Sequence, residues 1–282
     1  MITLDFNQPI IMGILNVTPD SFSDGGQCQS IKQAVALALK MIEEGADIID
    51  IGGESTRPGS NRISADEQLK RIIPVVQAVR DEIPGNILIS VDTTLAKVAS
   101  AALDAGSSIV NDISAGRDDD AMFELIAQQQ CLYIMLHMQG TPETMQNNPS
   151  YVDVVGEVRS FLLERADMAI AAGIKSQNII IDPGIGFGKT KVHNLELMAN
   201  LDRFVDTGFP VLLGTSRKRF MGAICENTPA NQLVGATCAT TVLGMAAGVK
   251  IFRVHDVRPN RQAADVANAI LKNIPSYDTR RN

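Results

Sequence analysis

The sequence predicts an α/β protein of the (β/α)8 barrel class, folded as a single domain over residues 1–282. Eight short apolar runs recur along the chain, and a segment with helical periodicity follows each of them. The 282 residues also suit such a barrel, which typically has about 250. No linker rich in Pro, Gly or Ser divides the chain. A doubly wound open sheet is the structural alternative, because it shows the same alternation of strands and helices.

The eight apolar runs are continuous rather than alternating. This pattern is typical of strands that are buried on both faces of a parallel sheet. The predicted strands are residues 10–15, 47–51, 87–91, 108–110, 131–136, 178–181, 210–213 and 250–254.

The segments between these strands repeat apolar residues at helical spacing. The clearest is SIKQAVALALKMIEE at residues 30–44, for which we expect Ser30 as the N-cap and Gly45 as the C-terminal stop. The predicted helices are residues 30–44, 65–83, 95–105, 119–129, 151–172, 193–205, 231–247 and 261–273. We expect residues 276–282 to be disordered.

The charge balance excludes two classes of partner. The net charge is −7, and the chain has no run of Lys and Arg longer than RKR at residues 217–219. A nucleic-acid or anionic membrane partner would require a basic face. The positive charge for an anionic substrate must therefore be gathered locally, in the site.

The cysteines and the N-terminus predict a reduced, cytoplasmic protein. Cys28, Cys131, Cys225 and Cys238 show no CxxC spacing and have no histidine near them in sequence, which argues against a zinc site. MITLDFNQPI has neither a basic start nor an apolar core typical of a signal peptide. The most apolar long window, residues 234–252, contains three threonines and Lys250, so we interpret it as a buried helix that runs into a strand.

Polar side chains follow all eight predicted strands. In a (β/α)8 barrel the loops after the strands share one mouth, where the chemistry takes place. A lone polar residue at a strand end is usually a turn or a helix cap, and a lone histidine is usually structural. Eight polar ends at one mouth favour a site. The residues or segments that follow the strands are Asn16, residues 52–60, Asp92, Asn111 and Asp112, His137, Asp182, residues 214–218, and Arg253 with His255.

Three familiar motifs are absent. In DPGIGFGKT the first glycine of a Walker A loop would fall at Pro183, and its three glycines are evenly spaced, unlike GxGxxG. GTSRK is not a GxSxG nucleophile elbow, so a Ser-His-Asp hydrolase is not indicated.

The polar strand ends combine two kinds of chemistry. Carboxylates such as Asp92 and Asp182 accept paired hydrogen bonds from an amino-pyrimidine edge, and the Asn111 amide adds a donor and an acceptor. These residues suit a flat nitrogen heterocycle. The cations of Lys218, Arg253 and His255 follow strands seven and eight, which is the usual phosphate site of these barrels. Asn16 offers an oxygen to Mg²⁺, which pairs with phosphate oxygens.

Eight stretches of the sequence resemble the dihydropteroate synthase family of pterin-binding barrels. They are NVTPDSFSDGG, DIGGESTRPGS, SVDT, VNDIS, IMLHMQGTPETMQ, IDPGIGFGKT, GTSRK and RVHDV, and they occur in the family's order between residues 10 and 257. The resemblance implies that dihydropterin-CH₂-pyrophosphate and p-aminobenzoate condense to dihydropteroate and pyrophosphate in folate synthesis.

The motif matches also imply a role for individual residues. The pterin would contact Asp92, Asn111, Met135, Asp182 and Lys218. Pyrophosphate would contact Asn16, Thr56, Arg253 and His255, with Mg²⁺ held at Asn16. p-Aminobenzoate and its sulfonamide analogues would contact Phe22, Arg57, Pro58, Phe187, Ser216 and Lys218. The residues expected to act in catalysis are Asn16, Asp92, Lys218, Arg253 and His255.

Three rival functions are weighed against this synthase. A pterin barrel that transfers a methyl group would share the Asp/Asn floor but would not need ESTRPGS or SRK. An aldolase-type barrel would use Lys218 as a Schiff base. A non-catalytic pterin-binding subunit would not need Asn16, Arg57 and Lys218, and all three are present. The small residues in 234–248 predict a homodimer, although a tightly packed internal helix explains them equally well.

Overall fold

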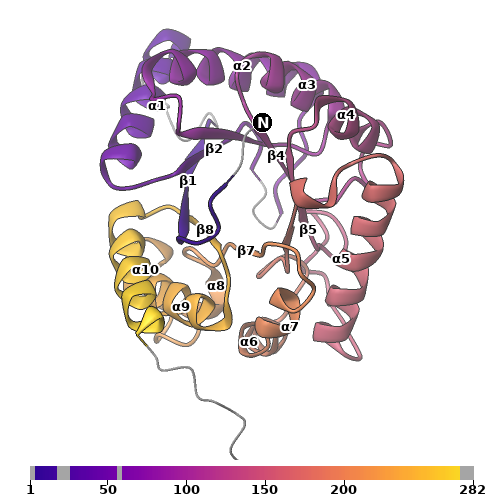
Figure 1. Ribbon diagram of the computed structural model, residues 1–282, viewed down its shortest axis with the longest axis vertical. Helices are drawn as coiled ribbons and strands as arrows, with labels where there is room; N and C mark the ends of the chain where they lie inside the picture. Colours follow the sequence, from indigo (N-terminus) through magenta and orange to yellow (C-terminus); the bar gives the residue numbers. More distant parts are fainter. Residues whose placement is uncertain (1–3, 18–25, 56–58, 274–282) are drawn as a thin grey trace, which may run out of the picture.

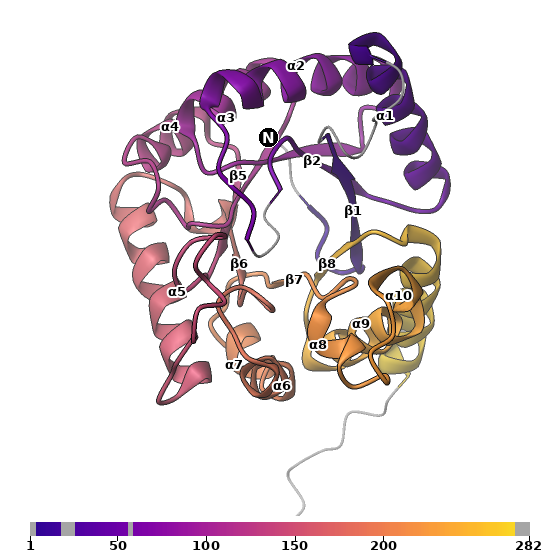
Figure 2. The same ribbon diagram turned by 180° about the vertical axis from the view of Figure 1, so that it is seen from behind.

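The computed structural model describes residues 4–17, 26–55 and 59–273, and its strands form a parallel barrel inside a ring of helices (Figures 1 and 2). The strand order is β6-β5-β4-β3-β2-β1-β8-β7. A bridge between Ile181 and Val211 connects the two end strands and closes the barrel. The strands are β1 Ile10–Asn16, β2 Ile48–Gly52, β3 Leu88–Asp92, β4 Ile109–Asp112, β5 Leu132–Leu136, β6 Ile179–Asp182, β7 Leu212–Leu213 and β8 Ile251–Val254. The predicted (β/α)8 barrel is confirmed.

The helices lie between successive strands and cover the outside of the barrel (Figure 1). They are α1 Gly26–Glu43, α2 Ala65–Glu82, α3 Ala96–Asp104, α4 Met122–Gln129, α5 Val154–Ala171, α6 Lys191–Ala199, α7 Asp202–Val205, α8 Arg219–Gly222, α9 Val234–Ala247 and α10 Val257–Lys272. Two short 3-10 helices, Ser176–Asn178 and Ala230–Gln232, precede β6 and α9.

The strands separate two hydrophobic cores. Alternate residues such as Met12, Ile48 and Ile251 fill the barrel interior. The residues between them, such as Ile11 and Ile49, pack outward with the helices. Both faces of each strand are therefore buried in apolar surroundings, which explains why the strands read as continuous apolar runs.

The strand register aligns polar residues in one layer at the carboxyl end of the barrel. Asn16 pairs with Gly52, Gly52 with Asp92, and Asp92 with Asn111. Leu136 of β5 pairs with Asp182 of β6 in the same way. Because residues in register on adjacent strands face the same side, these side chains meet at the barrel mouth.

Several predicted boundaries are corrected. The helix expected over 193–205 is two helices, since Asn200 leaves the helical conformation between α6 and α7. α1 begins at Gly26, so Ser30 lies inside the helix and is not its N-cap. Gly45 does end that segment, with φ of 98°. α10 begins at Val257 because Pro259 is tolerated in a first helical turn.

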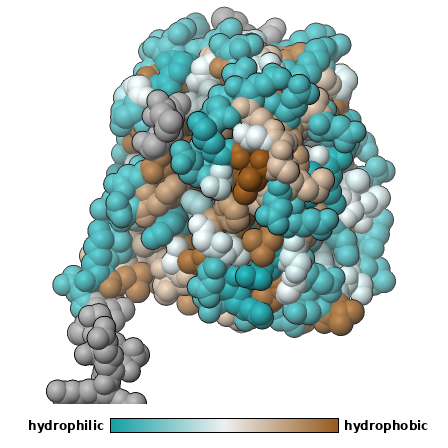
Figure 3. Space-filling view, turned by 45° about the vertical axis from the view of Figure 1, so that its right-hand side comes forward, coloured by the Kyte–Doolittle hydropathy of each residue, from teal (hydrophilic) through white to brown (hydrophobic). Residues whose placement is uncertain are grey.

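No helix among the described residues is long and apolar enough to cross a membrane. The face of the molecule seen in Figure 3 is mostly hydrophilic, with hydrophobic residues in separate places. The predicted tail at residues 276–282 lies outside the described residues.

Candidate active site

A cavity of about 1020 Å³ opens at the carboxyl ends of the strands. It brings together most of the predicted site residues that the structure describes. Those that line it are Asn16, Asp92, Asn111, Asp182, Phe187, Ser216, Lys218, Arg253 and His255. Phe22, Thr56, Arg57 and Pro58, also predicted, lie outside the described residues. These residues follow different strands and line one cavity.

Arg253 connects two carboxylates at the floor of this cavity. Its Nε donates to Asp50 Oδ2 at 2.6 Å, and its Nη2 donates to Asp92 Oδ2 at 2.8 Å. Asn111 Nδ2 donates to the same Asp50 oxygen at 3.3 Å. Asp50 is fully buried, and its Oδ1 has no hydrogen-bond partner among the described residues. The guanidinium of Arg253 is therefore paired with the carboxylates of Asp50 and Asp92.

Asp50 is a site residue that the sequence reading missed. It lies in β2, inside the run DIIDI at residues 47–51, for which the sequence predicts only a strand. The alternation of faces along a strand could have indicated it. A residue two positions before Gly52 faces the barrel interior, as Gly52 does. A charged residue at an interior position of a buried strand requires a partner, and Arg253 supplies it.

Burial raises the pKa values of the two other carboxyls of the site. Desolvation raises the pKa of Asp92 to about 7, although the nearby Arg253 lowers it. Desolvation likewise raises the pKa of Asp182 to about 6, against the hydrogen bond from Gly184 N and the charges of Lys218, Lys189 and Arg253. Both carboxyls can therefore change protonation state close to neutral pH.

Lys218 lies on the loop after β7, directly before α8. Its Nζ is 4.1 Å from the centre of the Phe187 ring, a cation–π contact. A Cβ on Gly186 would lie 3.0 Å from Lys218 Cδ, so only glycine admits the side chain so closely. Burial lowers the pKa of Lys218 to about 8, and Asp182 opposes this shift.

The loops after β7 and β8 hold each other by side-chain contacts. Ser216 Oγ lies 3.0 Å from His255 Nδ1 and accepts a hydrogen bond from His255 N at 3.1 Å. Arg217 donates to both carboxylate oxygens of Asp256, at 3.0 and 2.7 Å. Since Ser216 fixes the ring of His255, the two residues act as one unit at the cavity wall.

Two polar strand ends are structural, as the plain interpretation of such residues predicts. Asp112 is fully buried and accepts hydrogen bonds from Ser114 N, Gly116 N and Tyr133 Oη. It therefore stabilises the turn after β4 instead of facing the cavity. His137 is also buried, and desolvation with the charge of Lys189 lowers its pKa to about 2.

Met135 is a correction to the predicted site. It is fully buried in the outer core, between the barrel and the helices, and does not line the cavity. Its neighbour Leu136 lines the cavity instead. Successive residues of a strand point to opposite faces, so a shift of one residue exchanges core and site.

Asn16 is the residue predicted to hold a metal ion. Its Oδ1 and Asp92 Oδ2 would both lie within 4 Å of a Cβ on Gly52, at 3.8 and 3.7 Å, so the two oxygens share one corner of the cavity. The described residues contain no group of three or more His, Cys, Asp or Glu side chains placed to hold a metal. The donor set fits an ion that keeps most of its waters, as Mg²⁺ does.

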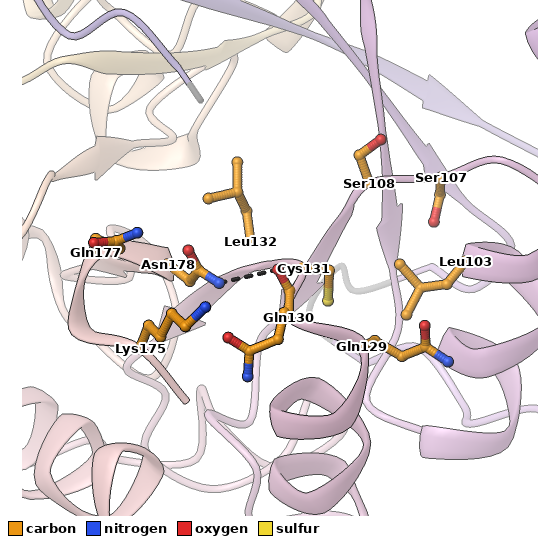
Figure 4. A pocket seen from close by; sticks show the side chains of 10 residues that line it. All are labelled: Leu103, Ser107, Ser108, Gln129, Gln130, Cys131, Leu132, Lys175, Gln177 and Asn178. Atoms are coloured by element: carbon orange, nitrogen blue, oxygen red, sulfur yellow. Dashed lines mark hydrogen bonds between the residues drawn. The ribbon is translucent and has the colours of Figure 1, made fainter. Parts of the chain in front are cut away.

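A second cavity, of about 410 Å³, lies at the amino ends of β4 and β5 (Figure 4). Glutamines, Lys175 and Cys131 line it, and Asn178 Nδ2 donates to Gln130 O at its edge. Burial raises the pKa of Cys131 to about 12, so its thiol is not a nucleophile at neutral pH. The active sites of (β/α)8 barrels lie at the opposite end, where the first cavity opens.

The barrel and its layer of carboxylates, amide and cations define an enzyme site suited to a flat, nitrogen-rich ring and an anionic group. A model of the family described as "Pterin binding enzyme" matches residues 12–255. The chain therefore belongs to the family of pterin-binding enzymes.

Individual relatives agree with this family. The dihydropteroate synthase of Synechocystis sp. (strain ATCC 27184 / PCC 6803 / Kazusa) is 45% identical over 262 residues, which cover 93% of this chain and 90% of that protein. Xanthomonas albilineans dihydropteroate synthase with 4-aminobenzoic acid superimposes with a TM-score of 0.89, at 40% identity over 96% of each chain. The same organism's enzyme in complex with 7,8-dihydropteroate gives 0.86, at 38% identity over 96% of this chain and 97% of that one.

Proposed function

We propose that this chain is a dihydropteroate synthase. It joins 6-hydroxymethyl-7,8-dihydropterin pyrophosphate to p-aminobenzoate and releases 7,8-dihydropteroate and pyrophosphate, a step of folate biosynthesis. The observation that carries the proposal is the single cavity that Asp92, Asn111 and Asp182 line together with Lys218 and Arg253. The 45% identity to a synthase over 93% of the chain supports the same reaction.

The pterin binds at the floor of the cavity in this proposal. The carboxylates of Asp92 and Asp182 accept hydrogen bonds from ring N–H and amino groups, and Asn111 supplies a donor and an acceptor. Lys218 contacts the ring from the side of Phe187. Leu136, rather than Met135, supplies apolar contact at this floor.

Pyrophosphate binds next to the pterin, at Asn16, Arg253 and His255. Arg253 and His255 end the same strand region and line the same cavity, so both cationic groups reach one anion. Thr56, on the loop after β2, is expected to join them. The contact with Ser216 fixes the orientation of the His255 ring for this role.

p-Aminobenzoate binds at the cavity wall formed by Phe187, Ser216 and Lys218. The Phe187 ring offers an aromatic face, and the Lys218 ammonium offers a charge to the carboxylate of the substrate. Phe22, Arg57 and Pro58 are expected to complete this subsite. A sulfonamide has the same aryl amine and a polar group in place of the carboxylate, so we expect sulfonamides to compete here.

Mg²⁺ is the metal ion that fits the site. Asn16 would hold it through one amide oxygen, with water and pyrophosphate oxygens as the other ligands. When bound, the ion offsets negative charge on the leaving pyrophosphate.

The residues of the chain stabilise charge during the reaction. The C–O bond to pyrophosphate breaks first, and its electron pair leaves with pyrophosphate, whose added charge Arg253 and His255 stabilise. Asp92 and Asp182 stabilise the electron-poor pterin cation that remains. The aryl amine nitrogen then attacks the exocyclic carbon and loses a proton. A weakly basic aryl amine needs no strong general base for this step.

We further propose that two chains form a homodimer through α9. This helix carries no charged residue, and its exposed positions include Ala239, Val242 and Leu243, with Val242 42% and Leu243 59% exposed. Small and apolar exposed residues allow a second copy to approach closely. We expect Leu243→Glu to convert a dimer to a monomer in sedimentation experiments, and a wild-type protein that sediments as a monomer would contradict the dimer.

The function is tested by mixing the protein with dihydropterin pyrophosphate, Mg²⁺ and p-aminobenzoate and by measuring pyrophosphate and dihydropteroate. Lys218→Ala should lower kcat/KM by about 100-fold, because the ammonium contacts the substrates. Lys175→Ala, an exposed lysine at the other end of the barrel, is the control that keeps full activity.

The rival functions give different results in the same assay. Pterin binding without dihydropteroate formation would favour a methyl-transfer barrel or a non-catalytic subunit over the synthase. Trapping of substrate on Lys218 by borohydride would favour Schiff-base chemistry. Pyrophosphate that is released without p-aminobenzoate would support bond breaking before the attack of the amine.

A further inference from the structure

Lys189 is a buried lysine that the proposed chemistry does not use. It lies in the loop after β6, in the stretch GIGFGK, and it lines the cavity although the residue is only 3% exposed. Among the described residues it forms no ion pair. A buried lysine without a carboxylate partner is rare and needs a structural reason.

The Lys189 ammonium has three acceptors for its three protons. Its Nζ lies 2.9 Å from His137 Nδ1, 3.0 Å from Phe187 O and 3.3 Å from His137 O. The burial that lowers the pKa of His137 keeps its ring neutral, and in the tautomer with the ring proton on Nε2 the Nδ1 atom accepts from the Lys189 ammonium. Burial lowers the pKa of Lys189 as well, but a neutral amine would satisfy only two of the three acceptors.

These contacts fasten the loop after β6 to the end of β5. The loop lies so close to β5 that a Cβ on Gly184 would overlap with His137 O, and one on Gly188 would lie 2.5 Å from Gln139 O. Gln146 Nε2 also donates to Gly186 O at 2.9 Å. Lys189 is the residue whose charged group holds the two segments at the side of the cavity.

The fastened loop carries the residues that contact Lys218. Phe187, whose carbonyl accepts from Lys189, presents its ring 4.1 Å from Lys218 Nζ. Gly186 lies against the Lys218 stem. The position of Lys218 in the cavity therefore depends on a loop that Lys189 holds.

We propose that Lys189 is a positioning residue for the synthase reaction: it holds the loop of Gly186 and Phe187 in place under Lys218 and adds a positive charge beside Asp182. The proposal rests on the proposed function. Lys189 acts together with Lys218 and Arg253, the other two cations near the Asp182 carboxylate.

The first test compares Lys189→Met with Lys40→Met, a control on the exposed surface of α1. We expect Lys189→Met to raise KM for p-aminobenzoate about 10- to 100-fold, because a misplacement near 1 Å has effects of that size. Lys40→Met should match the wild type. A folded Lys189→Met protein with the wild-type KM would overturn the proposal.

The second test is the pH dependence of pterin binding, measured by calorimetry. Without Lys189 the Asp182 carboxyl keeps only Lys218 and Arg253 as cations, so the pH midpoint of the Asp182 step of pterin binding should rise, whereas the Asp92 step should stay unchanged. A loosened loop alone would weaken binding at every pH without this shift. An unchanged midpoint in Lys189→Met would overturn the electrostatic part of the proposal.

Lys189→Arg keeps the charge but cannot place its planar group on the same three acceptors. It should therefore raise KM for p-aminobenzoate while the pH midpoint of pterin binding stays as in the wild type. This variant also carries the test if Lys189→Met does not fold, and an unchanged KM in Lys189→Arg would contradict the positioning role. A wild-type protein that forms no dihydropteroate would overturn the proposed function, whereas the pH midpoints would still decide the role of Lys189.

Discussion

Arg253 Nε lies 2.6 Å from Asp50 Oδ2. Asp50 lies two residues before the end of β2, and its carboxylate holds the guanidinium of Arg253 on β8. Asp50→Asn should lower the free energy of unfolding by about 3 kcal/mol, because it leaves a buried guanidinium with one carboxylate instead of two. It should also weaken pterin binding, since Arg253 and Asn111 both contact Asp50. Chemical denaturation and calorimetry measure the two effects.

Asp47→Asn is the matched control, at the other end of the same strand region. Asp47 is 46% exposed in its side chain and contacts Arg261 at 3.3 Å. We expect it to lower stability by about 1 kcal/mol or less and to leave pterin binding unchanged. Equal effects of the two substitutions would contradict a special role for Asp50.

The raised pKa values of Asp92 and Asp182 predict a pH dependence of pterin binding. Each carboxylate must be ionised to accept two hydrogen bonds, so affinity should fall as the pH decreases through about 7 and about 6. Calorimetry between pH 5 and 8, in roughly half-unit steps across the two pKa values, measures this. An affinity that stays constant over that range would show that the neutral carboxyls bind equally well.

The same two carboxyls predict the direction of a stability change. In the folded protein they bind protons up to pH values at which the unfolded chain, with aspartates near pKa 3.8, has lost them. Their contribution to the free energy of unfolding should therefore decrease as the pH rises from about 4 to about 7. Asp92→Asn and Asp182→Asn should each flatten this decrease in denaturation experiments.

Gly186 and Gly208 form a matched pair for testing the contact with Lys218. Both have positive φ, 83° and 84°, but a Cβ on Gly186 meets Lys218 at 3.0 Å, whereas one on Gly208 meets nothing within 4 Å. Alanine at either position should lower stability by about 1–2 kcal/mol because of the left-handed backbone. Only Gly186→Ala should also raise KM for the substrates. Equal kinetics in both variants would exclude a role for this close contact.

Gln68 links the loop after β2 to the loop after β3. Its Nε2 donates to Glu54 at 2.6 Å and its Oε1 accepts from Thr93 at 2.8 Å, and the residue is 1% exposed. Gln68→Leu should lower stability by about 1–2 kcal/mol, since it removes the hydrogen bonds to the buried Thr93 hydroxyl and the partly buried Glu54 carboxylate. It should also raise KM for p-aminobenzoate, because Glu54 begins the stretch that carries Arg57. Gln128→Leu, an exposed glutamine paired with Glu124, is the control without these effects.

Much of the barrel was predictable because local signals suffice for it. Each apolar run indicates a strand and each segment of helical periodicity indicates a helix, independently of the rest of the chain. The alternation of the eight runs with the eight helical segments indicates a parallel sheet. The failures lie where periodicity is interrupted. Asn200 divides one predicted helix in two, and α8 has only four residues, too few for a period to show.

The site was predictable in part, because a barrel brings strand ends together whatever their distance along the chain. This reasoning found Asp92, Asn111 and Asp182, which line one cavity. Met135, which the motif matches implied as a pterin contact, lies instead in the outer core, and the run LYIML is apolar at every position and contains no sign of which residues face inward. Asp50 and Lys189 were missed because each appears in a segment that had another explanation.

The sequence by itself therefore determined the fold class, the eight strand ends and the residue types that meet at the mouth. Tertiary structure alone decided whether each strand residue faces the barrel interior or the helices. A closed barrel buries both faces of every strand, so apolar residues occupy both and the sequence shows no alternation. It also decided the partners of the buried charges, namely Asp50 with Arg253 and Lys189 with His137 and Phe187. Asp50 and Arg253 come from β2 and β8, and Lys189 and His137 from the loops after β6 and β5, so only the packing of the strands brings them within hydrogen-bond distance.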